Sequence, residues 1–336
     1  MPEHTQPLLD PADRDGLERY LADRGWLVGG ERIGSIARAG EGNMNLTLRV
    51  RTTVRSVIVK QGRPWVEKYP VIAAPARRTA IEADWYELAG SVPGVAARLP
   101  RLLGVDRQAR VLLLSDLGDT GDYLHLYAGA KLSAAETDAL VDWLLELHGA
   151  FLGDERARRL CNREMRVLNH EHIFAVPLRA GNGLDLDQIT PGLSALAGEL
   201  REDRELLATV GALGERYLTA DRGTLLHGDY YPGSWLQAPE PWVIDPEFGF
   251  YGPPEFDLGV MLAHLQLADQ PVEHAGRAIA RYRRSARLDP RLAWRFAAVE
   301  VIRRLLGVAQ LPVSFDLAAK RTLIDRAREQ LTGVDR

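Results

Sequence analysis

The segment most informative about the fold and chemistry of this chain is residues 225–262, LLHGDYYPGSWLQAPEPWVIDPEFGFYGPPEFDLGVML. An HGD triplet occupies positions 227–229, and Ser234 follows Asp229 by five residues. A short apolar run, WVI, then ends in Asp245-Pro246-Glu247, and FDLG at positions 256–259 opens an apolar segment. We therefore expect two acidic loops joined by a short hairpin and followed by a helix.

Two acidic loops in one short segment are what phosphoryl transfer requires. One carboxylate orients the attacking hydroxyl, and others hold Mg²⁺ against the phosphates. The kinase catalytic loop has the form H-x-D-x-x-x-x-N, and this segment matches it except that Ser234 replaces the Asn. Alone, Asp229 would more often be a turn former in a Gly/Pro-rich loop, and Asp245 would simply begin a turn. The combination of HGD, a strand, DPE and FDxG favours a phosphotransferase.

A metal site is predicted from Ser234, Asp245 and Glu247. A serine hydroxyl is shorter than an Asn side chain and a weaker ligand, so we expect Glu247 to compensate. Asp245 and Glu247 are two residues apart, and on an extended segment they would point to the same side. Two carboxylates, with phosphate oxygens and water, suit octahedral Mg²⁺.

Upstream segments contain the parts of a nucleotide site. Gly40, Gly42 and Asn43 lie in a turn between two predicted strands, where backbone N–H groups can approach phosphates closely. Turns of this composition also join ordinary hairpins. Lys60 ends the apolar run SVIVKQ, as the kinase β3 lysine does, although an edge-strand lysine with its tip in water is the alternative. Glu82 follows 22 residues later in a helical run, where it would pair with Lys60.

Residues 99–118 predict two further strands and a hinge. Ser115-Asp116-Leu117 follows the apolar run VLLL and resembles the hinge between kinase lobes. By motif position, the Ser115 carbonyl and the Leu117 N–H would contact the adenine edge. Residues 1–117 would then form one lobe and residues 118–336 the other.

HGDxxxGS, together with DPEFxFYGPxxFDxG, resembles the methylthioribose kinases, a branch of the aminoglycoside-phosphotransferase-like kinases within the protein-kinase-like superfamily. That family also has Ser in place of the Asn, DPE in place of DFG, a G-x-G-N-x-N loop and V-K-Q on the lysine strand. The resemblance implies an α+β, protein-kinase-like bilobal fold, with an antiparallel sheet and a helix in the N-lobe and a mostly helical C-lobe. It implies ATP and Mg²⁺ as cofactors, and it implies that Asp257 accepts hydrogen bonds from the catalytic loop.

The same family has E-x-I-R-R at a second place, which matches Arg303 and Arg304 in the segment AAVEVIRRLLGVA. Adjacent arginines are ordinarily on the surface, but the apolar neighbours here leave little room for a wide polar face. In the family the pair faces the sugar and phosphate site. The resemblance implies that Arg303 and Arg304 offset charge on the transferred group, and that Asp229 deprotonates the C1 hydroxyl of 5-methylthioribose.

Three alternatives remain for the function. One is a kinase of another small alcohol, such as 5-deoxyribose. Another is an aminoglycoside phosphotransferase, whose polycationic substrate would favour an acidic pocket rather than an arginine pair. The third is a nucleotide-binding pseudokinase without turnover, which Ser234 leaves open. The chain is shorter than the resembling family between DPEF and the arginine pair, a segment that could shape the acceptor pocket.

Composition places the chain among soluble globular proteins. Forty-two basic and 46 acidic residues give a net charge of −4, so the chain has no overall pull towards nucleic acid or an anionic membrane. A single cysteine, Cys161, excludes an intrachain disulfide, and the charged N-terminus lacks the apolar core of a signal peptide. We expect a cytoplasmic enzyme with a small-molecule sugar alcohol substrate and no nucleic-acid or membrane partner. A homodimer is left open.

Two helices are predicted from their caps. Residues 10–25 form a helix that Asp10 would cap, with Pro11 in its first turn. Residues 133–151 form a second, with Ser133 and Glu136 as a capping box. His148, near the end of this helix, is assigned to packing rather than to catalysis.

Overall fold

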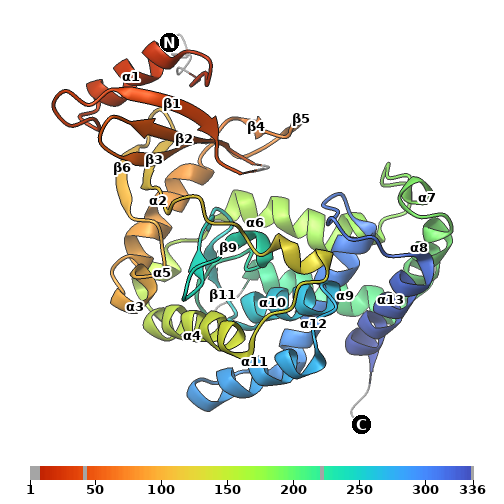
Figure 1. The fold of residues 1–336 in the computed structure, drawn as a ribbon. Helices are drawn as coiled ribbons and strands as arrows, with labels where there is room; N and C mark the ends of the chain where they lie inside the picture. The colour runs from red at the N-terminus through yellow and green to blue at the C-terminus, as the bar shows by residue number, and fades with distance from the viewer. Residues whose placement is uncertain (1–7, 41–43, 220–222, 334–336) are drawn as a thin grey trace. The chain divides into compact units, whose positions relative to one another are not determined.

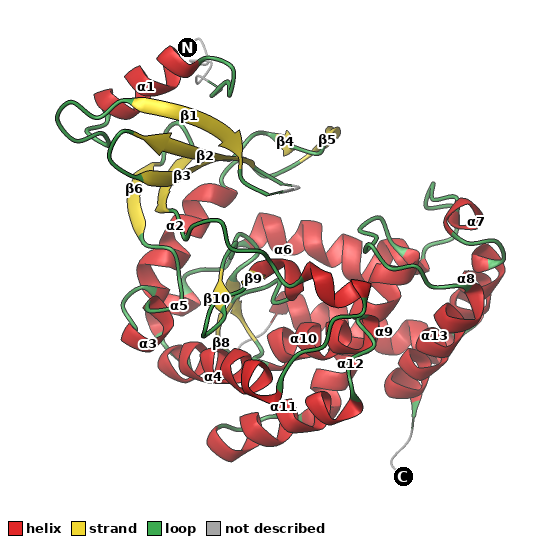
Figure 2. Cartoon of the chain, viewed as in Figure 1, coloured by secondary structure: helices red, strands yellow, loops and turns green. Residues whose placement is uncertain are grey.

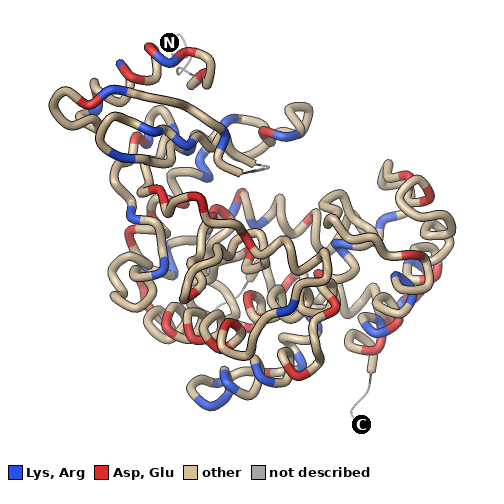
Figure 3. The backbone as a smooth tube through the Cα atoms, in the orientation of Figure 1, with Lys and Arg blue, Asp and Glu red and all other residues tan. Residues whose placement is uncertain are grey.

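The computed structural model describes residues 8–40, 44–219 and 223–333 (Figure 1). The chain divides into two compact units, residues 1–120 and residues 121–336. Figure 2 shows that strands dominate the first unit and helices the second. Basic and acidic residues are interspersed along both units (Figure 3). None of the helices in the described ranges is long and apolar enough to cross a membrane.

The N-terminal unit is built on a five-stranded antiparallel sheet with the order β1-β2-β3-β7-β6. One face is apolar because Leu48 and Val50 alternate with half-buried or exposed neighbours on β2, and Val57 and Val59 do the same at the start of β3. This face packs in one core cluster with Leu17 of the first helix. The elements of this unit are α1 (Arg14–Asp23), β1 (Ile33–Arg38), β2 (Leu46–Thr52), β3 (Ser56–Gln61), β4 (Trp65–Val66), β5 (Tyr69–Ala73), α2 (Arg78–Ala89), α3 (Pro93–Ala96), β6 (Leu102–Asp106) and β7 (Val111–Ser115).

The predicted cap of the first helix is wrong. Helix α1 begins at Arg14, and its N-cap is Asp13, whose side chain accepts a hydrogen bond from the Gly16 amide. Asp10 instead closes the preceding turn, where its carboxylate accepts from the Ala12 amide and its carbonyl from the Asp13 amide. Two acidic residues compete for the cap here, and Pro11 occupies the turn rather than the helix.

The C-terminal unit is mainly helical, with short strand pairs that carry the loops of the segment at 225–262. Its elements are η1 (Leu124–Ala128), α4 (Ala134–Phe151), α5 (Glu155–Arg158), α6 (Arg163–His170), η2 (Glu171–Ala175), η3 (Val176–Leu178), α7 (Leu186–Ile189), α8 (Leu193–Glu202), α9 (Arg204–Thr219), β8 (Thr224–Leu226), η4 (Pro232–Ser234), β9 (Trp235–Leu236), β10 (Trp242–Val243), β11 (Phe250–Gly252), α10 (Glu255–Leu267), α11 (Val272–Ser285), α12 (Pro290–Leu306) and α13 (Leu317–Thr332).

Helices α10 and α12 form the centre of this unit. Every residue of α10 except Gln266 is buried, which explains why its sequence is apolar all round rather than striped. Gly259 lets the two helices approach closely, because an added Cβ would lie 2.7 Å from the Ala293 carbonyl oxygen and from the Phe296 Cβ. The last residue of the FDLG motif is therefore a packing requirement.

Helix α4 confirms the predicted capping box. The Glu136 amide donates to the Ser133 hydroxyl, and the Ser133 amide donates to the Glu136 carboxylate. His148 is buried near the other end of α4 and contacts the Asp257 carboxylate and the Tyr282 hydroxyl. Its interactions are thus with other buried groups, as predicted.

Candidate active site

The HGD loop is held through its backbone amides by the side chain of Asp257. The Asp257 carboxylate, fully buried at the start of α10, accepts hydrogen bonds from the His227 amide at 2.7 Å and from the Gly228 amide at 2.9 Å. This confirms the predicted anchoring contacts of Asp257. Gly228 has a φ of +84°, and a Cβ there would lie 2.1 Å from the Phe248 carbonyl oxygen, so only glycine fits. The residue that follows, Asp229, is therefore held by a loop with little freedom.

His227 joins the two acidic loops to each other. Its ring Nε2 lies 2.9 Å from the Ile244 carbonyl oxygen, and the Asp229 amide donates to its Nδ1 at 3.3 Å. A carbonyl can only accept, so the imidazole carries its proton on Nε2. The histidine thus ties the residue before Asp245 to the amide of Asp229, and it is buried while doing so.

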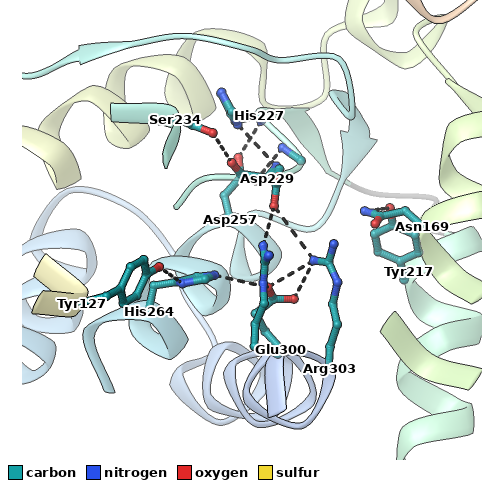
Figure 4. Close-up of polar contacts among 12 residues, drawn as sticks. Tyr127, Asn169, Tyr217, His227, Asp229, Ser234, Asp257, His264, Glu300 and Arg303 are labelled. Atoms are coloured by element: carbon teal, nitrogen blue, oxygen red, sulfur yellow. Dashed lines mark hydrogen bonds and ion pairs between the residues drawn. The ribbon is translucent and has the colours of Figure 1, made fainter. Parts of the chain in front are cut away.

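Asp229 faces the predicted arginine pair (Figure 4). Arg304 Nη2 lies 3.4 Å from Asp229 Oδ1, and Arg303 Nη1 lies 4.0 Å from the same oxygen. The Asp229 side chain is 19% exposed, whereas the side chains of Arg303 and Arg304 are 10% and 7% exposed. Burial raises the pKa of Asp229 although both arginines oppose this shift. A carboxylate with a raised pKa next to fixed positive charge suits a general base.

Glu300 holds the arginine pair from the opposite side. Its carboxylate accepts from Arg303 Nη1 at 2.9 Å and from Arg304 Nε at 2.6 Å, and it is 2% exposed. Burial alone would raise the pKa of Glu300, but the two arginines hold it well below its usual range. The spacing of three and four residues along α12 places all three side chains on one face. The arginines are therefore part of a buried charge cluster and not of a solvated surface.

The predicted metal residues Asp245 and Glu247 lie on the loop that follows β10, and Ser234 lies on η4. Carboxylate oxygens of Asp245 and Glu247 lie within 4.8 Å of one another, which is close enough to share one cation. Ser234 donates its hydroxyl hydrogen to the Asp229 carbonyl at 2.9 Å, which leaves oxygen lone pairs as its possible contribution to a metal. These oxygen donors fit a hard cation.

Asp245 and Glu247 do not lie on an extended segment, so that part of the prediction is wrong. The prediction assumed an extended segment, but Asp245 has a φ of +68° and Glu247 lies in a turn. A left-handed conformation at a residue other than glycine is uncommon and concentrates at functional sites. The turn, rather than strand alternation, brings the two carboxylates together.

Asn162 supports this turn and was not predicted. Its side-chain amide donates to the Glu247 carbonyl at 3.0 Å and to the Gly249 carbonyl at 2.9 Å, and the residue is buried. Its own φ of +41° precedes helix α6. An asparagine that contacts a turn 85 residues further along the chain has no local sequence signature, so only the three-dimensional structure reveals this contact.

The N-terminal unit contains the predicted lysine–glutamate pair. Lys60 Nζ donates to Glu82 Oε1 at 2.8 Å, and both side chains are buried. Lys60 lies on β3, the central strand of the sheet, so the edge-strand alternative is wrong. The pair joins the sheet to helix α2 in the way a phosphate-binding lysine requires.

The remaining predicted nucleotide residues also belong to this unit. Gly40 is described, with a φ of +69°, whereas Gly42 and Asn43 lie outside the described residues. Ser115 ends β7, where its amide donates to the Arg101 carbonyl and its hydroxyl accepts from the Arg101 amide. Leu117 follows two residues later, next to Asp116, whose carboxylate accepts from Arg49 on β2.

Comparisons with known proteins agree with this arrangement. A family model described as a phosphotransferase enzyme family matches residues 35–298. A methylthioribose kinase of Exiguobacterium sibiricum is 27% identical over 269 residues, which cover 73% of this chain and 64% of that protein. A methylthioribose kinase of Erwinia tasmaniensis is 31% identical over 246 residues, which cover 68% and 59%. The match thus spans less than two thirds of the length of these relatives. The resemblance predicted from the motifs is confirmed.

Solved structures confirm the fold class. Choline kinase LicA from Streptococcus pneumoniae superposes with a TM-score of 0.57 at 12% identity and covers 95% of this chain and 99% of its own. A spectinomycin phosphotransferase bound to ADP and spectinomycin gives a TM-score of 0.55 at 11% identity, covering 96% and 99%. The α+β, protein-kinase-like bilobal fold is therefore the fold of this protein. Since the family model covers most of its length, the chain belongs to the phosphotransferase enzyme family.

Proposed function

We propose that this chain is an ATP-dependent kinase of a small-molecule alcohol, with the C1 hydroxyl of 5-methylthioribose as its acceptor. The observation that supports this most directly is the placement of Asp229 on a backbone-anchored loop, 3.4 Å from Arg304. The relatives named methylthioribose kinase support the choice of acceptor. In this proposal the two compact units correspond to the N-lobe and the C-lobe.

The chemistry is assigned to named side chains. Asp229 orients the acceptor hydroxyl and takes its proton as the oxygen attacks the γ-phosphorus. Arg303 and Arg304 stabilise negative charge on the transferred group, which moves from ATP towards the acceptor oxygen. Both arginines are already fixed by Glu300, so little reorganisation is needed when that charge develops.

The other residues are assigned to ATP and Mg²⁺. Asp245 and Glu247, with Ser234, would hold Mg²⁺, which neutralises phosphate charge when bound. Lys60, oriented by Glu82, is assigned to the ATP phosphates together with the loop of Gly40, Gly42 and Asn43. The backbone groups of Ser115 and Leu117 are assigned to the adenine edge.

A panel of alcohols incubated with Mg-ATP carrying a labelled γ-phosphate tests the proposal. The expected result is transfer to methylthioribose with a higher kcat/KM than for 5-deoxyribose or an aminoglycoside. Asp229→Asn serves as the control, because its turnover should fall at least ~10²-fold while ATP still binds. Preference for another alcohol would replace the acceptor, and ATP binding without transfer to any alcohol would favour the pseudokinase alternative.

A further inference from the structure

We propose that His264 and Tyr127 are positioning residues for phosphoryl transfer, which fix the Glu300 carboxylate and through it the two arginines beside Asp229. The inference rests on the proposed function and adds two residues to its machinery. Figure 4 shows the chain of contacts, from Tyr127 through His264 to Glu300. The three residues come from η1, α10 and α12, which are far apart in the sequence.

Glu300 is the shared partner of three donors. Arg303 Nη1 lies 2.9 Å from one of its oxygens, and Arg304 Nε lies 2.6 Å from the other. His264 Nε2 lies 3.2 Å from that second oxygen. Because Glu300 and His264 are almost completely buried, water cannot replace a donor that is lost.

The proton positions on His264 follow from its neighbours. Nε2 faces the carboxylate of Glu300, which is acceptor-only when ionised, so Nε2 must carry a hydrogen. The hydroxyl of Tyr127 meets Nδ1, and burial raises the pKa of Tyr127, so this hydroxyl stays protonated and donates. Burial lowers the pKa of His264 to about 4, which leaves a neutral ring with one donor and one acceptor. Each polar atom along the contacts from Tyr127 through His264 to Glu300 is thus either a hydrogen-bond donor or an acceptor.

The distances indicate that Glu300, and not Asp229, is the main partner of both arginines. Arg304 lies closer to Glu300, at 2.6 Å, than to Asp229, at 3.4 Å, and Arg303 shows the same preference, at 2.9 Å against 4.0 Å. The arginines are therefore anchored to Glu300 and not locked onto Asp229. This leaves the Asp229 carboxylate able to accept a proton from an acceptor hydroxyl. If Glu300 lost its donor and shifted, the arginines would be free to close on Asp229.

The ring of Tyr231 completes the support around Arg304. The guanidinium lies 5.0 Å from the centre of the Tyr231 ring, and the same ring lies 5.2 Å from that of His264. Tyr231 follows the HGD triplet by two residues, so the catalytic loop itself contacts both Arg304 and His264. A change at His264 therefore reaches Asp229 by two routes.

The test uses the 336-residue chain and three variants. His264→Leu removes the donor, His264→Gln offers an amide N–H near the position of Nε2, and Tyr127→Phe removes the hydroxyl. We expect kcat to fall about tenfold in His264→Leu and about threefold in Tyr127→Phe, on the scale of one lost hydrogen bond, with KM for ATP unchanged. His264→Gln should recover most of the loss. His274→Leu is the matched control and should leave kcat unchanged, since His274 joins α11 to the Thr137 hydroxyl of α4 and is not among the described residues that contact Glu300, Arg303, Arg304 or Asp229.

Nitrogen NMR of the histidine rings gives a readout that needs no substrate. We expect a neutral His264 with its hydrogen on Nε2 at pH 7. A ring protonated on Nδ1 would overturn the proposal, and so would wild-type kcat in His264→Leu or a folded His264→Gln variant no better than His264→Leu. Kinetics are measured on whichever alcohol the wild type phosphorylates. If it phosphorylates none, the proposed function fails. The NMR measurement still decides whether His264 is hydrogen-bonded to Tyr127 and Glu300 as described.

Discussion

Asp257→Asn should weaken the fold and the reaction together. The two carboxylate oxygens of Asp257 accept separately from the amides of His227 and Gly228. Asparagine has one carbonyl oxygen, so it keeps one of these bonds and turns an NH₂ group towards the other amide. A lost hydrogen bond to a charged acceptor and a buried unpaired donor cost about 2–4 kcal/mol of unfolding free energy together. His148 Nε2, 3.2 Å from Asp257, loses a charged partner as well.

The same change should reduce turnover because it moves Asp229. A loop displaced by about 1 Å costs on the order of 10²-fold in rate. The assay is urea unfolding at pH 7 beside steady-state kinetics, with Asp229→Asn as the matched variant. Asp229→Asn should lose turnover without losing stability, because burial already disfavours the ionised Asp229 carboxylate. If the unfolding free energy of Asp257→Asn equalled that of the wild type, the assignment of Asp257 as the anchor of the loop would be refuted.

Three further predictions concern the metal, the arginines and pH. Asp245→Ala and Glu247→Ala should each raise the Mg²⁺ concentration needed for half-maximal activity, and an unchanged Mg²⁺ dependence in Glu247→Ala would contradict its role as a compensating ligand. Arg303→Lys should lower kcat much more than it raises KM for the acceptor, since lysine cannot copy the guanidinium fork; equal effects on both constants would count against a role in the transition state. Burial lowers the pKa of His264 to about 4 in the folded protein, against 6.5 for a histidine in water, so its contribution to stability is complete above pH 6.5 and is lost as pH falls towards 4. Relative to His264→Gln, the wild type should lose up to about 3 kcal/mol of unfolding free energy over that window; parallel pH curves would disprove the buried neutral ring.

Sequence patterns predicted correctly a strand, the start of a helix and an ion pair that belongs to a known motif. The run SVIVKQ became β3 with the predicted bounds, because three consecutive β-branched residues precede the lysine there. The capping box at Ser133 and Glu136 fixed the start of α4, since both partners lie within one turn. The ion pair between Lys60 and Glu82 followed from a motif that places a strand and a helix side by side.

The errors occur where the answer depends on more than neighbouring residues. Asp10 and Asp13 are both plausible caps by sequence, and the turn closed by Asp10 decided between them. At Asp245 the sequence predicted an extended backbone, but tertiary contacts hold a φ of +68°. Asn162, from a separate segment, supports that turn by donating to two of its carbonyls. No periodicity in the sequence encodes such a contact.

Glu300 shows how one missed contact changes a functional argument. In the sequence Glu300 is the first residue of the E-x-I-R-R match, with no role assigned to it, and the arginine pair that follows argues against a polycationic acceptor. In the structure the two arginines are matched by Glu300 and Asp229, so the cluster is formally neutral when all four groups are ionised. Positive charge alone therefore does not exclude an aminoglycoside. We still expect a neutral acceptor, for another reason. Such a substrate would enter without disturbing a buried, charge-matched cluster, whereas each ammonium group of a cationic one would need an additional carboxylate. In the proposed mechanism the phosphoryl group brings negative charge to this cluster when it arrives, and we expect the arginines to act at that moment.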